Sequence, residues 1–164
     1  MRDKTLGAYI VGLVLNSLIL FAIVTVAYWK AGNAQRLDNV TPVGAWKTVD
    51  DVTGQINSVV KIWAEEGKLY GRIEKLINPD PNDPDPRCVR CSGELKGQRL
   101  IGLRIVWGLK KDGDRWSGGE ILDPDSGKIF SCSITVQDGG KKLKVRGFMG
   151  LSLLGRTEYW LRDE

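Results

Sequence analysis

Short runs of β-forming residues, separated by turn signals, recur along the chain from residue 42 onward. Clusters of Asp, Gly and other turn-forming residues lie at 50–54, 66–67, 112–113, 123–127, 138–140 and 150–155. Most of these clusters are roughly 8 to 15 residues apart, which is typical of antiparallel hairpins in a β-sandwich or β-barrel. Residues after Lys30 show no helical period. We count eight runs, which start near Val43, Ile56, Lys68, Arg99, Arg115, Lys128, Lys141 and Arg156.

Four of these runs alternate apolar and polar residues, which assigns one face of each strand to the core. One apolar and one polar face on each strand suits a single sheet that closes on itself, although an open sandwich is also compatible with the pattern. Glycines within the runs, such as Gly71 and Gly147, would let a small barrel bend sharply. The predicted inner faces are Leu69, Gly71 and Ile73; Ile101, Leu103, Ile105, Trp107 and Leu109; Phe130, Cys132, Ile134 and Val136; and Leu143, Val145 and Met149.

An apolar segment at residues 6–29 precedes the β-rich region, with Arg2 and Lys4 before it. As a helix it would be about 36 Å long, enough to cross a hydrocarbon core of about 30 Å. The preceding cations favour a cytoplasmic N-terminus. A secretory signal usually has a shorter apolar core, although small residues at 32–34 would suit signal peptidase. We predict a signal anchor or signal peptide at 1–30, a linker at 31–41 and a β-domain at 42–164 that is periplasmic and tethered to the inner membrane, or periplasmic or secreted after cleavage.

The charge balance and the absence of histidine argue against several classes of function. The chain has 24 Lys and Arg and 20 Asp and Glu, of which residues 1–40 hold four cations and two anions. The remaining charges are nearly balanced and form no basic stripe, so nucleic acid is not an expected partner. Histidine is the commonest general base and metal ligand, and the chain contains none. We therefore expect a protein that is not an enzyme and binds no cofactor or metal.

Three cysteines allow at most one disulfide within the chain. Cys88 and Cys91 are three residues apart in the Pro- and Asp-rich segment 78–97, and an exported protein meets an oxidising compartment, so we predict a bridge between them. A zinc site would need four ligands, and a redox-active pair would need a helix N-terminus in a thioredoxin-like frame, which the pattern does not provide. Cys132 is interpreted as a small buried apolar side chain.

A set of short motifs extends this interpretation to a family. The motifs are Pro42-Val43-Gly44-Ala45-Trp46-Lys47-Thr48, Lys68-Leu69-Tyr70-Gly71, Cys88-x-x-Cys91, Trp107-Gly108-Leu109, Trp116-x-Gly118-Gly119, Leu122-Asp123-Pro124, and Gly155-Arg156-Thr157 with Trp160. In this order they resemble a bacterial family of exported proteins catalogued as a domain of unknown function. The resemblance implies an all-β calycin fold, an eight-stranded antiparallel up-and-down barrel like that of lipocalins, usually behind a cleaved signal peptide. Gly44-x-Trp46 is also similar to the lipocalin opening, in which the tryptophan packs beneath an arginine, here Arg162 or Arg156.

A barrel of this size can hold one small ligand, and its apolar inner face would suit a lipid or fatty-acid-like compound of the cell envelope. The alternative is a structural or interaction protein of an envelope assembly whose barrel is filled by its own side chains. The apolar connection at 147–155 would be a plug, a ligand portal or a membrane-contacting patch. The predicted ligand-binding residues are Trp46, Leu103, Ile105, Trp107, Trp116, Phe130 and Ile134.

Overall fold

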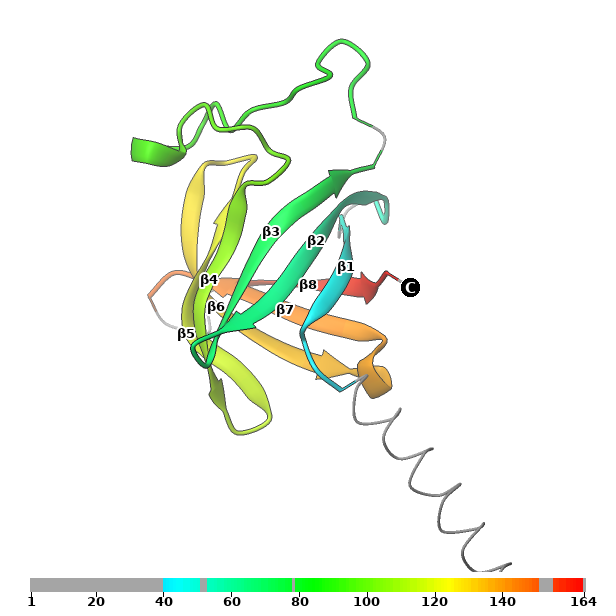
Figure 1. Cartoon of the computed structure of the whole chain (residues 1–164), viewed down its shortest axis with the longest axis vertical. Helices are drawn as coiled ribbons and strands as arrows, with labels where there is room; N and C mark the ends of the chain where they lie inside the picture. The colour runs from blue at the N-terminus through cyan, green and yellow to red at the C-terminus, as the bar shows by residue number, and fades with distance from the viewer. Residues whose placement is uncertain (1–39, 51–52, 78, 151–154, 164) are drawn as a thin grey trace, which may run out of the picture. The chain divides into compact units, whose positions relative to one another are not determined.

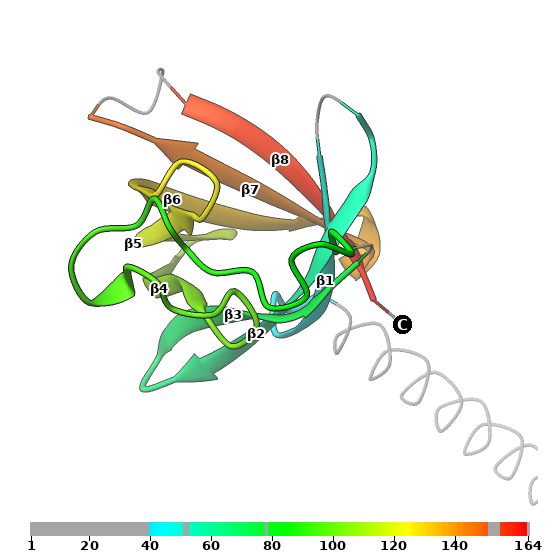
Figure 2. The same cartoon turned by 90° about the horizontal axis from the view of Figure 1, so that it is seen from above.

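The computed structural model describes residues 40–50, 53–77, 79–150 and 155–163, and these form a closed antiparallel barrel. Each strand pairs with the next along the chain, and β8 returns to pair with β1 (Figures 1 and 2). The prediction of an eight-stranded antiparallel up-and-down barrel is confirmed. Its strands are β1 (Gly44–Val49), β2 (Ile56–Glu65), β3 (Lys68–Leu76), β4 (Arg104–Asp112), β5 (Arg115–Asp123), β6 (Lys128–Gln137), β7 (Lys142–Phe148) and β8 (Gly155–Arg162), with short 3-10 turns η1 (Gly93–Leu95) and η2 (Asp138–Gly140).

Seven of the eight strands begin within one residue of the position predicted from the turn signals. The exception is β4, which begins at Arg104 rather than near Arg99. Gly102 has a φ of 91°, a left-handed conformation that interrupts an extended strand. Before it, Arg99 forms only an isolated bridge with Arg87. Residues 77 and 79–103 therefore belong to one long connection between β3 and β4, seen in green at the upper end of Figure 1.

The predicted inner faces of three strands agree with the observed burial. Leu69 and Ile73 on β3, Ile134 on β6, and Leu143 and Val145 on β7 are all buried. Met149, which the alternation assigned to the same face as Leu143 and Val145, follows the end of β7 and is exposed. The core is thus the interior of the barrel, filled by alternate residues of its strands.

The predicted inner face of β4 is wrong at Trp107. Ile105 and Val106 are both buried, and the pairing of β4 with β3 shifts register twice. The shift between Gly71 and Arg72 leaves Ile105 as an extra residue on β4 before Trp107, and the shift between Leu69 and Tyr70 leaves Gly108, with a φ of 80°, as an extra residue after it. A bulge adds one residue to a strand and reverses the side to which later residues point. Trp107 consequently lies on the outer face, where its Nε1 donates a hydrogen bond of 2.8 Å to Glu120.

One end of the barrel is closed around Trp46, which is fully buried. The Trp46 indole Nε1 donates a 2.8 Å hydrogen bond to the carbonyl oxygen of Pro42. The guanidinium carbon of Arg162 lies 4.2 Å from the Trp46 ring centroid, and its Nη2 donates a 2.7 Å hydrogen bond to the carbonyl oxygen of Thr41. Of the two arginines that the resemblance offered for this position, the structure places Arg162 there.

The proposed leader at 1–30 and nearly all of the linker at 31–41 lie outside the described residues. Within the described ranges, no helix is long and apolar enough to cross a membrane.

Candidate ligand cavity

A cavity of about 620 Å³ opens at the end of the barrel formed by the β1–β2, β5–β6 and β7–β8 connections. Every strand contributes at least one residue to its lining. The volume falls in the range of about 300 to 1,000 Å³ that is usual for sites of small ligands. The barrel therefore encloses space that its own described side chains do not fill.

An apolar wall comes mainly from β3 to β7. Ile73, Ile105 and Val145 are nearly inaccessible to solvent at its base, and Phe130 lies higher in the same wall. Gly147 keeps this wall open, because a Cβ added there would lie 3.5 Å from the Cβ of Phe130. A larger residue at this position would extend into the cavity.

A polar wall comes from β8, β1 and β2. Glu158 Oε2 accepts a 3.2 Å hydrogen bond from the Nε1 of Trp160, and Oε1 lies 3.6 Å from the Nε of Arg156. The side chain of Glu158 is 34% exposed and that of Arg156 is 57% exposed, so the carboxylate lies deeper than the guanidinium. Next to them, the hydroxyls of Thr48 and Ser58 are 2.9 Å apart. Groups of both signs and two hydroxyls thus face the apolar wall, and Asp50, Asn57, Asp123 and Asp125 add further polar groups to the lining.

The two walls meet at the seam between β1 and β8. Of the described residues, β1 and β8 pair only at Trp46–Arg162 and Lys47–Leu161, whereas β7 and β8 pair at seven positions. Beyond this short ladder, the β1–β2 hairpin and β8 diverge (Figure 2). Thr48 on one side and Glu158 on the other both line the cavity. The polar wall therefore borders the part of the barrel with the shortest ladder.

Cys132 lies on the inner face of β6 beneath the cavity and carries the unbonded thiol. Burial and, to a smaller extent, the negative charge of Glu158 raise the pKa of Cys132 to about 12. A thiol with this pKa is protonated at neutral pH and is a poor nucleophile or metal ligand.

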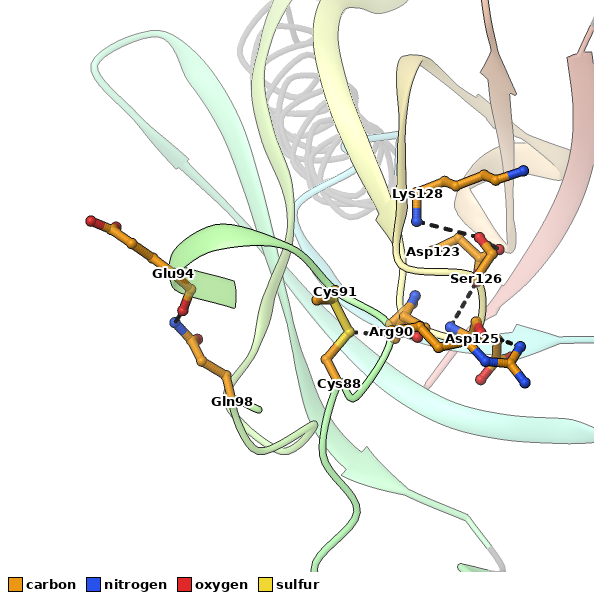
Figure 3. The surroundings of a disulfide bond; sticks show 10 residues. Cys88, Arg90, Cys91, Glu94, Gln98, Asp123, Asp125, Ser126 and Lys128 are labelled. Carbon is orange, nitrogen blue, oxygen red and sulfur yellow. Dashed lines mark hydrogen bonds between the residues drawn. A yellow bond between two sulfur atoms is a disulfide. The ribbon is translucent and has the colours of Figure 1, made fainter. Parts of the chain in front are cut away.

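Cys88 and Cys91 form a disulfide beside the β5–β6 turn (Figure 3). Between them, Arg90 donates a 2.8 Å hydrogen bond from Nη1 to the carbonyl oxygen of Asp125 in the β5–β6 turn. The Sγ of Cys88 is 3.5 Å from the carbonyl oxygen of Pro124 in the same turn. Pro124 and Asp125 both line the cavity, so the disulfide loop supports residues of its rim.

Two of the seven predicted ligand-binding residues, Ile105 and Phe130, line the cavity. The other five lie elsewhere. Leu103, Ile134 and Trp46 are buried in the barrel core, Trp116 is half-buried with the Nζ of Lys111 5.6 Å from its ring centroid, and Trp107 is on the outside.

Sequence alternation missed the polar wall because the pattern on β8 is inverted. Tyr159 and Leu161 are 46% and 40% exposed on the outer face, while Glu158 and Trp160 point inward and line the cavity. A hydropathy rule that assigns apolar residues to the core would choose the opposite phase. The signal that could have found the correct phase is Trp160 together with Arg162, whose contact with Trp46 fixes the inner side of β8.

Trp107 belongs to a row of aromatic residues on the outer face. Trp63, Tyr70 and Trp107 are direct neighbours across β2, β3 and β4. The rings of Trp63 and Tyr70 stack with centroids 5.9 Å apart, and the guanidinium carbon of Arg104 lies 5.3 Å from the Tyr70 centroid. This row is separate from the cavity.

The part of the chain that the structure describes contains no group of three or more Cys, Asp or Glu residues placed to hold a metal ion.

Comparisons with known proteins agree with this architecture. The barrel is similar to the solved structure of protein HP1028 from the human pathogen Helicobacter pylori, which belongs to the lipocalin family. The similarity has a TM-score of 0.66 at 17% sequence identity and covers 76% of this chain and 84% of that one. No curated protein matches the chain. The family model described as an uncharacterized protein conserved in bacteria, DUF2147, matches residues 44–162, and the chain belongs to this family.

Proposed function

We propose that this protein is a binding protein of the cell envelope that holds one small hydrophobic ligand, lipid or fatty-acid-like, inside its barrel. The observation that carries the proposal is the cavity of about 620 Å³ with an apolar wall and a few polar groups. Sites for small molecules commonly combine these two features, since apolar walls supply affinity and a few polar groups fix orientation. The similarity to a lipocalin-family barrel supports the fold on which this proposal rests.

The alternative, an interaction protein with a filled barrel, has less support. Among Trp46, Trp63, Trp107, Trp116 and Trp160, which could fill the interior, only Trp160 lines the cavity. The observation that favours the alternative is the outer aromatic row, because aromatic residues beside arginine on an outer surface are common in protein interfaces. An interaction surface and a ligand cavity are compatible on one barrel.

We propose that the protein is not an enzyme. The polar wall presents one Glu beside Arg156, and the nearby Cys132 thiol has a raised pKa. Hydrolytic catalysis commonly needs a nucleophile activated by a base, and the sequence provides no histidine for that role. These groups are better suited to orienting a ligand than to attacking it.

For its location, we propose the inner membrane with the domain in the periplasm, or the periplasm or exterior if the leader is cleaved. The apolar segment at 6–29 and the Cys88–Cys91 disulfide support export, because structural disulfides persist in oxidising compartments. A reporter fused after Glu164 should be active only on the outer side. Activity of a cytoplasmic reporter at that position would contradict the proposal.

The binding proposal is tested with a neutral hydrophobic fluorophore, N-phenyl-1-naphthylamine, titrated into the full chain. We expect saturable binding, with energy transfer from tryptophan because Trp160 lies in the cavity wall. Gly147→Leu adds an apolar side chain inside the cavity and should abolish this binding. Lys61→Leu adds the same side chain on the exposed outer face of β2 and should leave it intact. Equal binding by both variants would place the fluorophore outside the cavity and contradict the proposal.

A further inference from the structure

We propose that the ligand is an amphiphile with a positively charged head group, a long-chain amine in chemical class, whose ammonium binds the carboxylate of Glu158. This inference rests on the proposed binding function and chooses among the polar ends that a hydrophobic ligand could carry. It excludes a free fatty acid, whose carboxylate would have to occupy the same polar wall.

The charged groups of the cavity lining favour a cationic ligand. Among the described residues, the lining contains four carboxyl groups and one guanidinium, from Asp50, Asp123, Asp125, Glu158 and Arg156. At neutral pH this complement is net negative. A charge in a partly dehydrated cavity interacts with its neighbours more strongly than it would in water, so the lining favours a cationic ligand over an anionic one.

Glu158 lies where an ammonium group could bind while an alkyl chain contacts the apolar wall. Val145, directly opposite Glu158 in the β7–β8 ladder, belongs to the apolar wall, so the carboxylate borders the surface that would hold an alkyl chain. An ionised carboxylate has about four acceptor sites. Trp160 Nε1 uses one of them, and Arg156 lies beside the other oxygen at 3.6 Å. Glu158 therefore retains capacity to accept hydrogen bonds from an ammonium group.

Arg156 is the only cation in the described lining, and its surroundings disfavour an anionic head group. Its Nε is already paired with Glu158, and its side chain is more than half exposed. A ligand carboxylate at Arg156 would approach Glu158 as well, and like charges at that separation repel. The site is consequently a poor receptor for an anionic head group.

The hydroxyls of Thr48 and Ser58 complete the polar wall without adding charge. They are hydrogen-bonded to each other at 2.9 Å, and the hydroxyl of Thr48 also accepts a 3.1 Å hydrogen bond from the Ser58 amide. Hydroxyl oxygens have two acceptor lone pairs each, so this pair can accept a further donor. The hydroxyl of Thr48 also donates a 3.4 Å hydrogen bond to the carbonyl oxygen of Ser58, so the hydroxyl of Ser58 is the one that retains acceptor capacity for a head group that donates hydrogen bonds, as an ammonium does.

The test compares three probes with the same twelve-carbon chain: dodecylamine, dodecanol and dodecanoate. Each is titrated against N-phenyl-1-naphthylamine bound to the full chain at neutral pH, with the amine and the carboxylate below their micellar concentrations and the alcohol below its solubility limit. We expect the amine to bind at least about tenfold more tightly than the carboxylate, a factor that corresponds to about 1.4 kcal/mol. The preference should shrink as salt is added, because salt screens the partly exposed charges of the cavity rim.

Two matched variants assign the effect to Glu158. Glu158→Gln keeps the size of the side chain and removes its charge, so it should weaken dodecylamine binding by about tenfold while dodecanol binding changes by less than about twofold. Glu120→Gln makes the same change on the outer face and should alter neither. Circular dichroism and melting temperature establish that both variants are folded. If Glu158→Gln fails to fold, the comparison of the three head groups on the unaltered chain still decides the proposal.

The outcomes separate this inference from the function on which it rests. If dodecanol binds and dodecanoate binds as tightly as dodecylamine, the cationic head group is refuted and the binding function stands. Retention of the amine preference in folded Glu158→Gln would refute the role of Glu158. If none of the three probes displaces the fluorophore, the proposed binding function fails, and this inference fails with it.

Discussion

Two glycines on one inward row of the barrel should respond in opposite ways to the same substitution. Gly119 pairs with Cys132, which in turn pairs with Gly147, and neither glycine has a positive φ. A Cβ on Gly147 would make ordinary contacts, at 3.5 Å from Phe130 and 3.6 Å from Ile121. Where the backbone already suits alanine, Gly→Ala stabilises a protein by about 0.4–1 kcal/mol, chiefly by restricting the unfolded chain. We expect this gain for Gly147→Ala.

At Gly119 the added methyl group would overlap backbone atoms of the β4 bulge. It would collide with the carbonyl oxygen of Trp107 and the amide nitrogen of Leu109, and would lie 2.7 Å from the carbonyl carbon of Gly108. Backbone atoms cannot rotate away as a flexible side chain can, so the bulge itself would have to move. Overpacking of a core costs about 1–3 kcal/mol or more, and we expect about 3 kcal/mol for Gly119→Ala.

The two variants should therefore differ by nearly 4 kcal/mol, which is a factor of several hundred in the folding equilibrium constant. Urea unfolding of the full chain, followed by tryptophan fluorescence, measures both free energies of unfolding, and similar m-values would show that the unfolded states are comparable. If Gly119→Ala is no less stable than Gly147→Ala, the close approach of β5 to the bulge at Gly108 is wrong.

Three further changes have defined outcomes. Arg162→Lys keeps the charge but loses the planar guanidinium that covers Trp46 and donates hydrogen bonds to backbone carbonyls. It should lower the free energy of unfolding by about 1–3 kcal/mol, and an unchanged melting temperature would contradict this. Replacing Cys88 and Cys91 with alanine should lower the free energy of unfolding by only about 1–2 kcal/mol, because the disulfide closes a very short ring. Loss of the folded barrel in this variant would contradict the prediction. Folding raises the pKa of the Cys132 thiol from 9.0 to about 12, so the unfolded chain loses this proton first as the pH rises. The free energy of unfolding should therefore fall by up to about 1.4 kcal/mol per pH unit between those two values. Cys132→Ala should flatten this pH dependence, and parallel plots of stability against pH for the two proteins would contradict the prediction.

The strand order could be predicted from sequence because the information is local. Turn clusters mark the ends of strands, and alternation within a strand marks its faces. For β3, β6 and β7 these signals sufficed, as the burial of Ile73, Ile134 and Val145 shows. Closure was implied by the family resemblance, because the local pattern also suited an open sandwich and the β1–β8 pairing that closes the barrel is distant in sequence.

The faces of β4 could not be predicted in the same way, because a bulge depends on the partner strand. The sequence from Ile105 to Leu109 alternates acceptably in a regular strand, with Trp107 inside. In the barrel, Val106 pairs with Gly71, and the absence of a side chain there lets Val106 point inward. That choice is set by contacts between strands, and the pattern of a single strand does not contain it.

The cavity itself follows from a gradient of size and polarity along the inner faces, measured from the end closed by Trp46. On β7 the inward residues shrink from Leu143 through Val145 to Gly147, and on β8 they change from Trp160 to Glu158. An eight-stranded barrel is just wide enough to be filled by its own side chains, so a cavity requires small or polar residues toward one end. Large apolar residues buried at the other end stabilise the fold and offset the packing that is lost around the cavity. The gradient on β7 and β8 therefore places the cavity at the end of the barrel away from Trp46, and under the binding function that we propose, the charge of Glu158 at that end would set the preference among hydrophobic ligands.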